Sequence, residues 1–196
     1  DLHLSLGPAD KPMDVFGGAW VGYVDKLREG LSVIGPEDTT VLPGDLSWAL
    51  GIEQAKEDFA FISAIPGRKI LLKGNHDYWW TTATKFYHFC AARGWDDMFI
   101  LNNNCYFYGE TALCGTRGWF YEQEQEGTHD EKIFRRELGR LEASLKAAGD
   151  HEKLCFLHYP PRYRGYECPE ILGLLARYGV RQCFYGHLHA ESMRLA

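Results

Sequence analysis

The sequence predicts an α/β protein, and two observations carry that prediction. Short apolar runs of strand length alternate along the chain with amphipathic stretches of helical spacing. Several of these runs end in glycine followed by polar residues, as strands do at the binding edge of an open α/β sheet. The chain has 196 residues, of which 45% are hydrophobic and 24% charged, so we expect a single domain over residues 1–196.

The helices and strands can be placed in order from the apolar pattern. Helical spacing is marked by Trp20, Val24, Leu27 and Leu31, by Ala55, Phe59 and Ile62, and by Phe134, Leu138, Leu141 and Leu145. The runs expected as strands are 40–42, 70–72, 99–101, 105–108, 112–114, 154–157 and 182–185. The order from Val41 through Phe59 to Leu72 is that of a βαβ unit with parallel strands. The closely spaced runs within 99–114 indicate antiparallel hairpins, so the sheet, or pair of sheets, should be mixed.

Composition and charge exclude some classes of function. A formal net charge of -6 argues against extended nucleic-acid binding through a basic face, but it permits a small phosphorylated substrate. No apolar run approaches the roughly 18 residues of a membrane span, and no signal peptide is visible. The six cysteines form no C-x-x-C pair, which favours a reduced, cytoplasmic setting over a disulfide framework. Because the chain starts at Asp1 and stops at Ala196, we expect a first strand and C-terminal strands outside it.

Polar side chains follow four of the expected strands. Asp45 follows the first run, the stretch 75–77 follows the second, His158 follows the run 154–157, and two histidines follow the last. Parallel strands bring such residues to one edge of a sheet. Asp1 and His3 fit as a further contribution, because an i, i+2 spacing places both side chains on one side of an extended segment. The candidate metal ligands are Asp1, His3, Asp45, Asn75, His158, His187 and His189.

The chemistry of this set favours a pair of transition-metal ions. Mixed nitrogen and oxygen ligands suit Mn, Fe or Zn better than Ca, and the absence of cysteine ligands disfavours a closed structural zinc site. Seven ligands are too many for one tetrahedral ion and suit two ions that share a carboxylate. Such two-metal sites serve in-line displacement at phosphorus.

The motifs resemble a known family. "DLH" at Asp1, "GD" at Gly44, "GNHD" at Gly74, the single His158 and "GHLH" at Gly186 resemble, in order, the five signature blocks of the calcineurin-like metallophosphoesterases. The small bacterial phosphoesterases of that superfamily are the most similar type. The resemblance implies an α/β fold of two mixed β-sheets packed as a sandwich and flanked by helices, with a two-metal centre at one edge.

The resemblance also implies a role for each residue. One ion would be held by Asp1, His3, Asp45 and His189, and the other by Asp45, Asn75, His158 and His187. Asp45 would then bridge the two ions, of which Mn²⁺ is the first expectation and Fe or Zn the alternatives. His76 would protonate the leaving oxygen of the substrate or stabilise its developing charge. Asp77 would orient His76.

We therefore expect a metal-dependent phosphoesterase that hydrolyses a phosphate monoester or diester by in-line attack of a hydroxide shared by the two ions. Protein Ser/Thr phosphatases carry an arginine soon after "GD" and the sequence "GNHE", whereas this chain has "GDLSWAL" and "GNHD". A nuclease or cyclic-nucleotide phosphodiesterase on the same fold is the alternative enzyme. A non-catalytic binding scaffold is the alternative of another class, although such scaffolds typically lose ligands and none is lost here.

The aromatic residues and the arginines near these motifs can each be interpreted in two ways. The aromatic side chains beside the motifs either line a substrate cleft or pack in the core; they are Trp48, Tyr78, Trp79, Trp80 and Trp119. Arg117 and Arg162, in loop-like stretches, either bind phosphate oxygens or are solvated at the surface.

Overall fold

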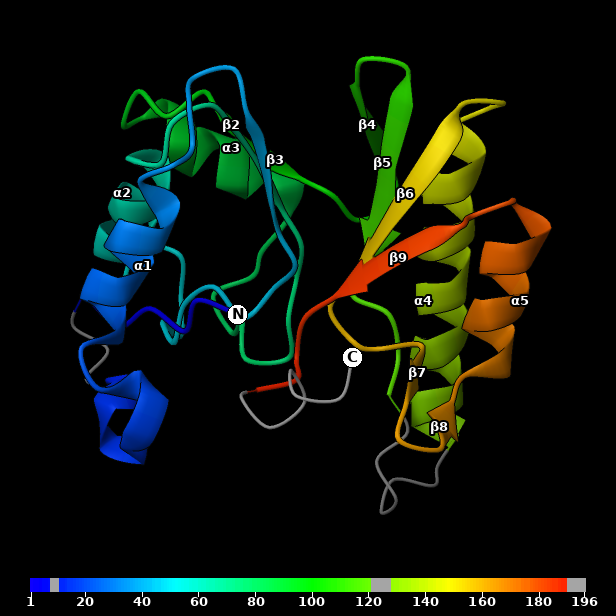
Figure 1. The fold of residues 1–196 in the computed structure, drawn as a ribbon, viewed down its shortest axis with the longest axis horizontal. Coiled ribbons are helices and arrows are strands. Elements are labelled where there is room, and N and C mark those ends of the chain that lie inside the picture. The colour runs from blue at the N-terminus through cyan, green and yellow to red at the C-terminus, as the bar shows by residue number, and fades with distance from the viewer. Residues whose placement is uncertain (8–10, 121–127, 190–196) are drawn as a thin grey trace. The chain divides into compact units, whose positions relative to one another are not determined.

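The computed structural model describes residues 1–7, 11–120 and 128–189, and the chain divides into two compact units (Figure 1). Of the described residues, the first unit comprises Asp1–Ile100 together with His189, and the second comprises Leu101–Leu188. Each unit has its own sheet and its own apolar core. The single domain expected over residues 1–196 stays a prediction.

The first unit is built on a three-stranded parallel sheet with the order β1-β2-β3. Its elements are the 3-10 helices η1 (Met13–Phe16) and η2 (Gly18–Trp20), α1 (Tyr23–Leu31), β1 (Thr39–Leu42), α2 (Lys56–Ser63), β2 (Arg68–Leu71), α3 (Ala83–Ala91) and β3 (Met98–Ile100). The βαβ unit expected from Val41 to Leu72 is confirmed, because β1 and β2 pair in parallel around α2.

Burial explains why α2 and α3 cover this sheet (Figure 1). Phe59 and Ile62 of α2 and Phe86 of α3 are fully buried in one core with Leu71 of β2. The buried Lys69 ammonium donates hydrogen bonds to the carbonyl oxygens of the last turn of α2 and the loop after it. The bond to Ser63 uses a carbonyl that the helix end leaves without an intrahelical donor, so it fixes the end of α2 to β2.

The run 99–101 was assigned to an antiparallel hairpin, and that assignment is wrong. It forms β3, which pairs in parallel with β2 at Phe99 opposite Ile70. The reason is α3, a helix that the sequence analysis missed and that carries the chain across the sheet before β3. A crossover of this kind makes parallel strands.

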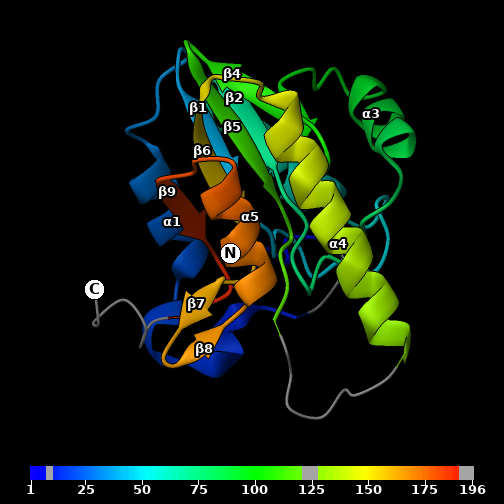
Figure 2. The same cartoon turned by 90° about the vertical axis from the view of Figure 1, so that its right-hand side faces the viewer.

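The second unit is built on a mixed four-stranded sheet with the order β4-β5-β6-β9. Its elements are β4 (Cys105–Tyr108), β5 (Thr111–Thr116), α4 (Thr128–Ala147), β6 (Glu152–Leu157), β7 (Arg162–Tyr163), β8 (Tyr166–Glu167), α5 (Pro169–Arg177) and β9 (Gln182–Tyr185). The expected hairpin is confirmed for β4 and β5, which are antiparallel, whereas β5, β6 and β9 run parallel. Figure 2 shows α4 and α5 on one face of this sheet, where their apolar residues form the second core.

The α/β class is therefore confirmed, with several sheets, five α-helices and no closed barrel among the described residues. One of the main sheets is wholly parallel and the other is mixed. The described helices include none with the length and apolarity that crossing a bilayer requires.

Candidate metal centre

The first residues of the chain pair with the loop after β1, and this pairing places His3 against Asp45. The His3 N–H donates to the Asp45 carbonyl oxygen at 2.8 Å, and the Leu4 N–H donates to that of Leu46 at 3.0 Å. Both side chains are buried, and His3 Nε2 lies 3.6 Å from Asp45 Oδ2. That distance is too long for an ordinary hydrogen bond between them. It is close to the ~3.4 Å that separates two ligand atoms of one tetrahedral ion with bonds of about 2.1 Å.

His189 and Asp1 belong to the same unit. The His189 ring centroid lies 5.0 Å from that of His3. Asp1 is half-buried, with its Oδ1 atom fully buried, two residues before His3 on the same segment. The structure therefore gathers in the first unit all four residues that the resemblance assigns to one ion.

The backbone at Asp45 is strained, and backbone N–H groups of the next loop donate hydrogen bonds to its carboxylate. His3 and Asp45 both have positive φ angles, 46° and 51°, which residues other than glycine rarely adopt and which cluster at functional sites. The His76 N–H donates to Asp45 Oδ1 at 2.8 Å, and the Asn75 N–H also bonds this carboxylate. Burial raises the pKa of Asp45 to about 7. A divalent cation beside it would favour the charged form.

Gly74 is required by the close approach of the "GNHD" turn to Asp45. A Cβ atom at position 74 would lie 2.1 Å from Asp45 Oδ1 and 2.2 Å from the Asp45 nitrogen. No side chain fits there unless Asp45 moves.

Replacing Gly74 by alanine is therefore expected to displace the Asp45 carboxylate and to weaken metal binding by at least about 10-fold, the lower end of what disturbing a ligand's support costs. Isothermal titration of the metal-free protein with Mn²⁺ measures this affinity. Gly30→Ala is the matched control, because nothing lies within 4 Å of a Cβ atom there. Equal affinities for the two variants would contradict the role of Gly74.

Asp77 has different partners from those that the resemblance implies. Its carboxylate accepts hydrogen bonds from the backbone N–H groups of Asp45, Leu46, Ser47 and Gly74 and from the indole N–H of Trp79. His76 Nδ1 is buried and makes no hydrogen bond within the described part of the chain. Asp77 therefore ties the loop after β1 to the loop after β2, and its orienting of His76 stays a prediction.

Two tryptophans that could have lined a cleft pack inside the protein. Trp48 is buried, stacks on His3 at a centroid distance of 5.2 Å and lies 4.5 Å from the His76 ring. It thus supports both imidazoles. Trp79 is 2% exposed and belongs to the core, whereas Tyr78 is 57% exposed. Burial lowers the pKa of His76.

His158 and His187 come together in the second unit. They follow β6 and β9, which end level with each other because Leu157 pairs with Tyr185 (Figure 1). The two rings lie 5.2 Å apart, and His158 is fully buried. His187 has a φ angle of 68°, again in the left-handed region. Of the second predicted ligand set, Asp45 and Asn75 belong to the first unit.

Asp58 is a supporting residue that the sequence analysis missed. Its carboxylate, 1% exposed, accepts hydrogen bonds from the Ser47 hydroxyl and from the Leu6 N–H. It therefore fixes both segments whose pairing brings His3 to Asp45. The signal was available, because Asp58 is an acidic residue on the buried face of α2 with Ala55 and Ile62.

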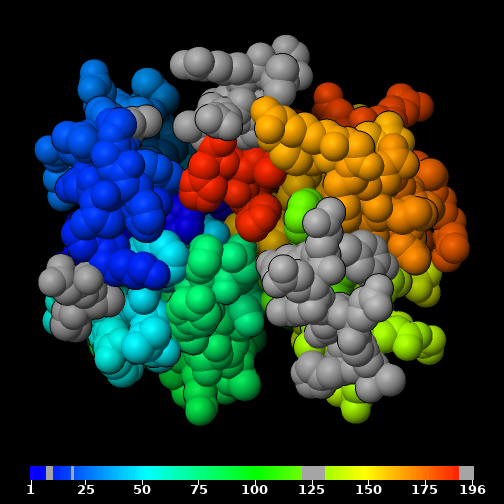
Figure 3. Space-filling model, turned by 90° about the horizontal axis from the view of Figure 1, so that it is seen from below, coloured from blue at the N-terminus to red at the C-terminus, as the bar shows by residue number. Residues whose placement is uncertain are grey.

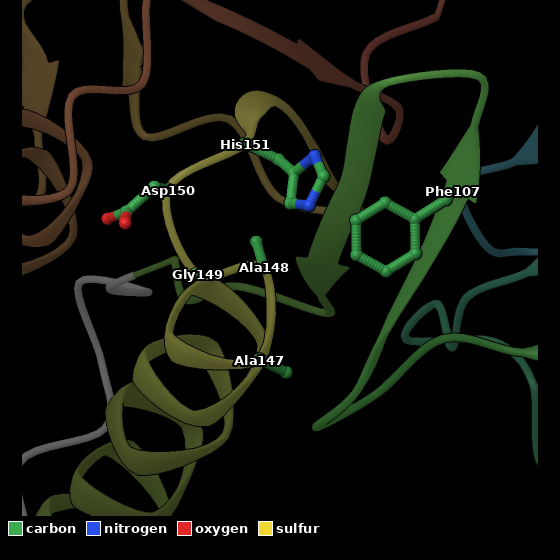
Figure 4. Close-up of a pocket in the computed structure, with 6 residues that line it drawn as sticks. All are labelled: Phe107, Ala147, Ala148, Gly149, Asp150 and His151. Atoms are coloured by element: carbon green, nitrogen blue, oxygen red, sulfur yellow. The ribbon is translucent and has the colours of Figure 1, made fainter.

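A hollow in the second unit is lined by residues of β4 and of the segment between α4 and β6 (Figure 4). This shallow pocket of about 470 Å³ is lined by Phe107 and by residues Ala147 to His151. Those residues precede β6, at the opposite end of that strand from His158.

Imidazole and carboxylate groups are the ligands that transition metals prefer, and loops after parallel strands are where α/β proteins place their sites. The fold and these clusters are therefore typical of a metal-dependent enzyme. The model of the calcineurin-like phosphoesterase family matches residues 1–191, and the chain belongs to this family. The resemblance is therefore confirmed, and membership implies metal-dependent hydrolysis of phosphoesters and the binding of divalent ions. A comparison with curated proteins finds no match to the chain.

Proposed function

We propose that this hydrolase uses two divalent ions, Mn²⁺ first and Fe or Zn as alternatives, to cleave the phosphoester of a small substrate. The observation that supports it most strongly is the buried His3–Asp45 pair, whose 3.6 Å spacing suits two ligands of one ion. The donor set of imidazole nitrogens and carboxylate and amide oxygens matches these metals. When bound, such ions supply hydroxide near neutral pH and neutralise charge on the phosphoryl group.

In this proposal, some residues bind the two ions and His76 assists the departure of the leaving group. Asp1, His3, Asp45 and His189 would hold one ion, and Asp45, Asn75, His158 and His187 would hold the other. Water oxygen bonds to phosphorus in line with the leaving oxygen, the bond from phosphorus to that oxygen breaks, and a proton reaches the leaving oxygen. His76 supplies this proton or stabilises the developing charge, with its ring held by Trp48.

His76→Ala is expected to lower kcat by about 10²- to 10⁴-fold, because a general acid contributes that much. Metal content should not change, since His76 is not a ligand. Steady-state kinetics with elemental analysis of the same samples measures both. His88→Ala, at an exposed position in α3, is the control. Loss of metal in His76→Ala, or unchanged kcat, would show that this role is wrong.

The alternatives are separated by substrate. Activity on bis(p-nitrophenyl) phosphate without activity on p-nitrophenyl phosphate would favour the nuclease or cyclic-nucleotide phosphodiesterase. Binding of Mn²⁺ with no hydrolysis of either ester would favour the non-catalytic scaffold. A cytoplasmic setting stays part of the proposal, supported by the free thiols of all six cysteines.

A further inference from the structure

Arg117 stands at the same sheet edge as the two histidines of the second unit. It directly follows β5, and β5, β6 and β9 are parallel neighbours whose ends are in register at Thr116, Leu157 and Tyr185. Its carbonyl oxygen accepts the N–H of His158 at 3.0 Å and that of Tyr159 at 2.9 Å. Figure 3 looks at this end of the unit, with the segment that carries β7 and β8 (orange) on its surface. Arg117 is thus fixed by its backbone to the loop that carries His158.

The Arg117 side chain has no carboxylate partner in the described part of the chain. It is half-buried, and its Nε atom is buried without a hydrogen bond. Its guanidinium carbon lies 5.9 Å from the Tyr159 ring, and that ring lies 4.8 Å from His187. Burying a donor of a cationic group without an acceptor is costly, and an anionic ligand at this position would relieve that cost.

Other arginines of the second unit, unlike Arg117, pair with a carboxylate. Arg140 pairs with Glu137 at 2.9 Å, and Arg162 pairs with Glu167 at 2.8 Å. The buried Glu137 also accepts the Thr116 hydroxyl, one residue before Arg117. Glu137 is therefore engaged with Thr116 and Arg140, and no carboxylate of the described residues pairs with Arg117 on the loop that carries His158.

We propose that Arg117 binds a terminal oxygen of the substrate phosphoryl group and makes the enzyme selective for phosphomonoesters. This inference rests on the proposed function. A phosphomonoester has three terminal oxygens and up to two negative charges, whereas a diester has two terminal oxygens and one charge. A guanidinium near Tyr159, on a residue whose backbone is bonded to the loop that carries His158, would match the additional oxygen and charge of the monoester. Arginine is suited to phosphate because its planar guanidinium can donate two parallel hydrogen bonds.

The test compares two esters in three variants of the full chain loaded with Mn²⁺. For Arg117→Met, kcat/KM on p-nitrophenyl phosphate should fall about 10- to 100-fold, the loss expected for a hydrogen bond to a charged group. On bis(p-nitrophenyl) phosphate it should change less than about 3-fold. Arg117→Lys should recover part of the monoester activity, because lysine restores the positive charge but not the planar guanidinium that donates two parallel hydrogen bonds. Arg162→Met is the matched control and should behave as wild type on both esters.

A binding measurement provides a readout independent of turnover. Titration with inorganic phosphate should show affinity lowered about 10-fold or more in Arg117→Met, with metal content unchanged. Equal losses on the two esters, or unchanged phosphate affinity in Arg117→Met, would overturn the assignment. Wild-type protein that binds metal but hydrolyses neither ester would instead overturn the proposed function, and its phosphate affinity relative to Arg117→Met would still decide whether Arg117 binds phosphate.

Discussion

Replacing Asp45 by asparagine is expected to lower the rate of phosphoester hydrolysis by at least about 10³-fold, since charge stabilisation by metal ions is worth several kcal/mol. Asparagine keeps the size of the side chain and can still accept the His76 N–H. It removes the charge that two ions would share, so the metal content should fall below two ions per chain. Initial rates on p-nitrophenyl phosphate and elemental analysis of dialysed protein measure the two effects.

The control for Asp45→Asn is Asp25→Asn. Asp25 is 85% exposed and pairs with the surface residue Arg28, so this variant should retain both activity and metal. Asp45→Asn protein that keeps two ions per chain would contradict the bridging role of Asp45, whatever its activity.

Replacing Asp77 by alanine is expected to cost about 4 kcal/mol of the free energy of unfolding, because each buried donor left without an acceptor costs about 1–3 kcal/mol and relaxation recovers part of the total. The donors are the four backbone N–H groups and the Trp79 indole N–H that now reach Asp77. Metal binding should weaken as well, because Asp45 and Gly74 would lose their common anchor. Urea unfolding followed by tryptophan fluorescence measures the stability.

Asp96→Ala is the matched control for Asp77→Ala, since Asp96 is exposed in a loop. Its effect should stay within about 0.5 kcal/mol. If Asp77→Ala unfolded at the same urea concentration as this control, the carboxylate could not be the tie between the two loops.

Most of the strands of the two main sheets could be predicted from the sequence because they depend on local patterns. The runs 105–108 and 182–185 match β4 and β9, and the βαβ unit around α2 is confirmed. The errors arise where the chain's path depends on an element with a weaker signal. The helix α3 carries Phe86, Phe89 and Cys90 as its buried face within only nine residues, and missing it led to the wrong pairing for β3.

The supporting residues were harder to predict than the ligands. Metal ligands belong to few residue types and follow strands, so His3 and Asp45 could be proposed together from their sequence context. The anchoring role of Asp77 was missed because its partners are backbone N–H groups, some about 30 residues earlier in the chain, and no side-chain pattern marks such donors. Trp48 reads equally well as a cleft residue or a packing residue until its contacts with His3 and His76 are known.

The most direct test of the two-metal proposal is electron paramagnetic resonance of the full chain loaded with Mn²⁺. Two ions about 3.5–4 Å apart should couple magnetically, so we expect the spectrum of a coupled Mn²⁺ pair. Asp45→Asn should abolish that coupling. A six-line spectrum of isolated Mn²⁺ in the fully loaded wild-type protein would contradict a centre in which Asp45 joins two ions.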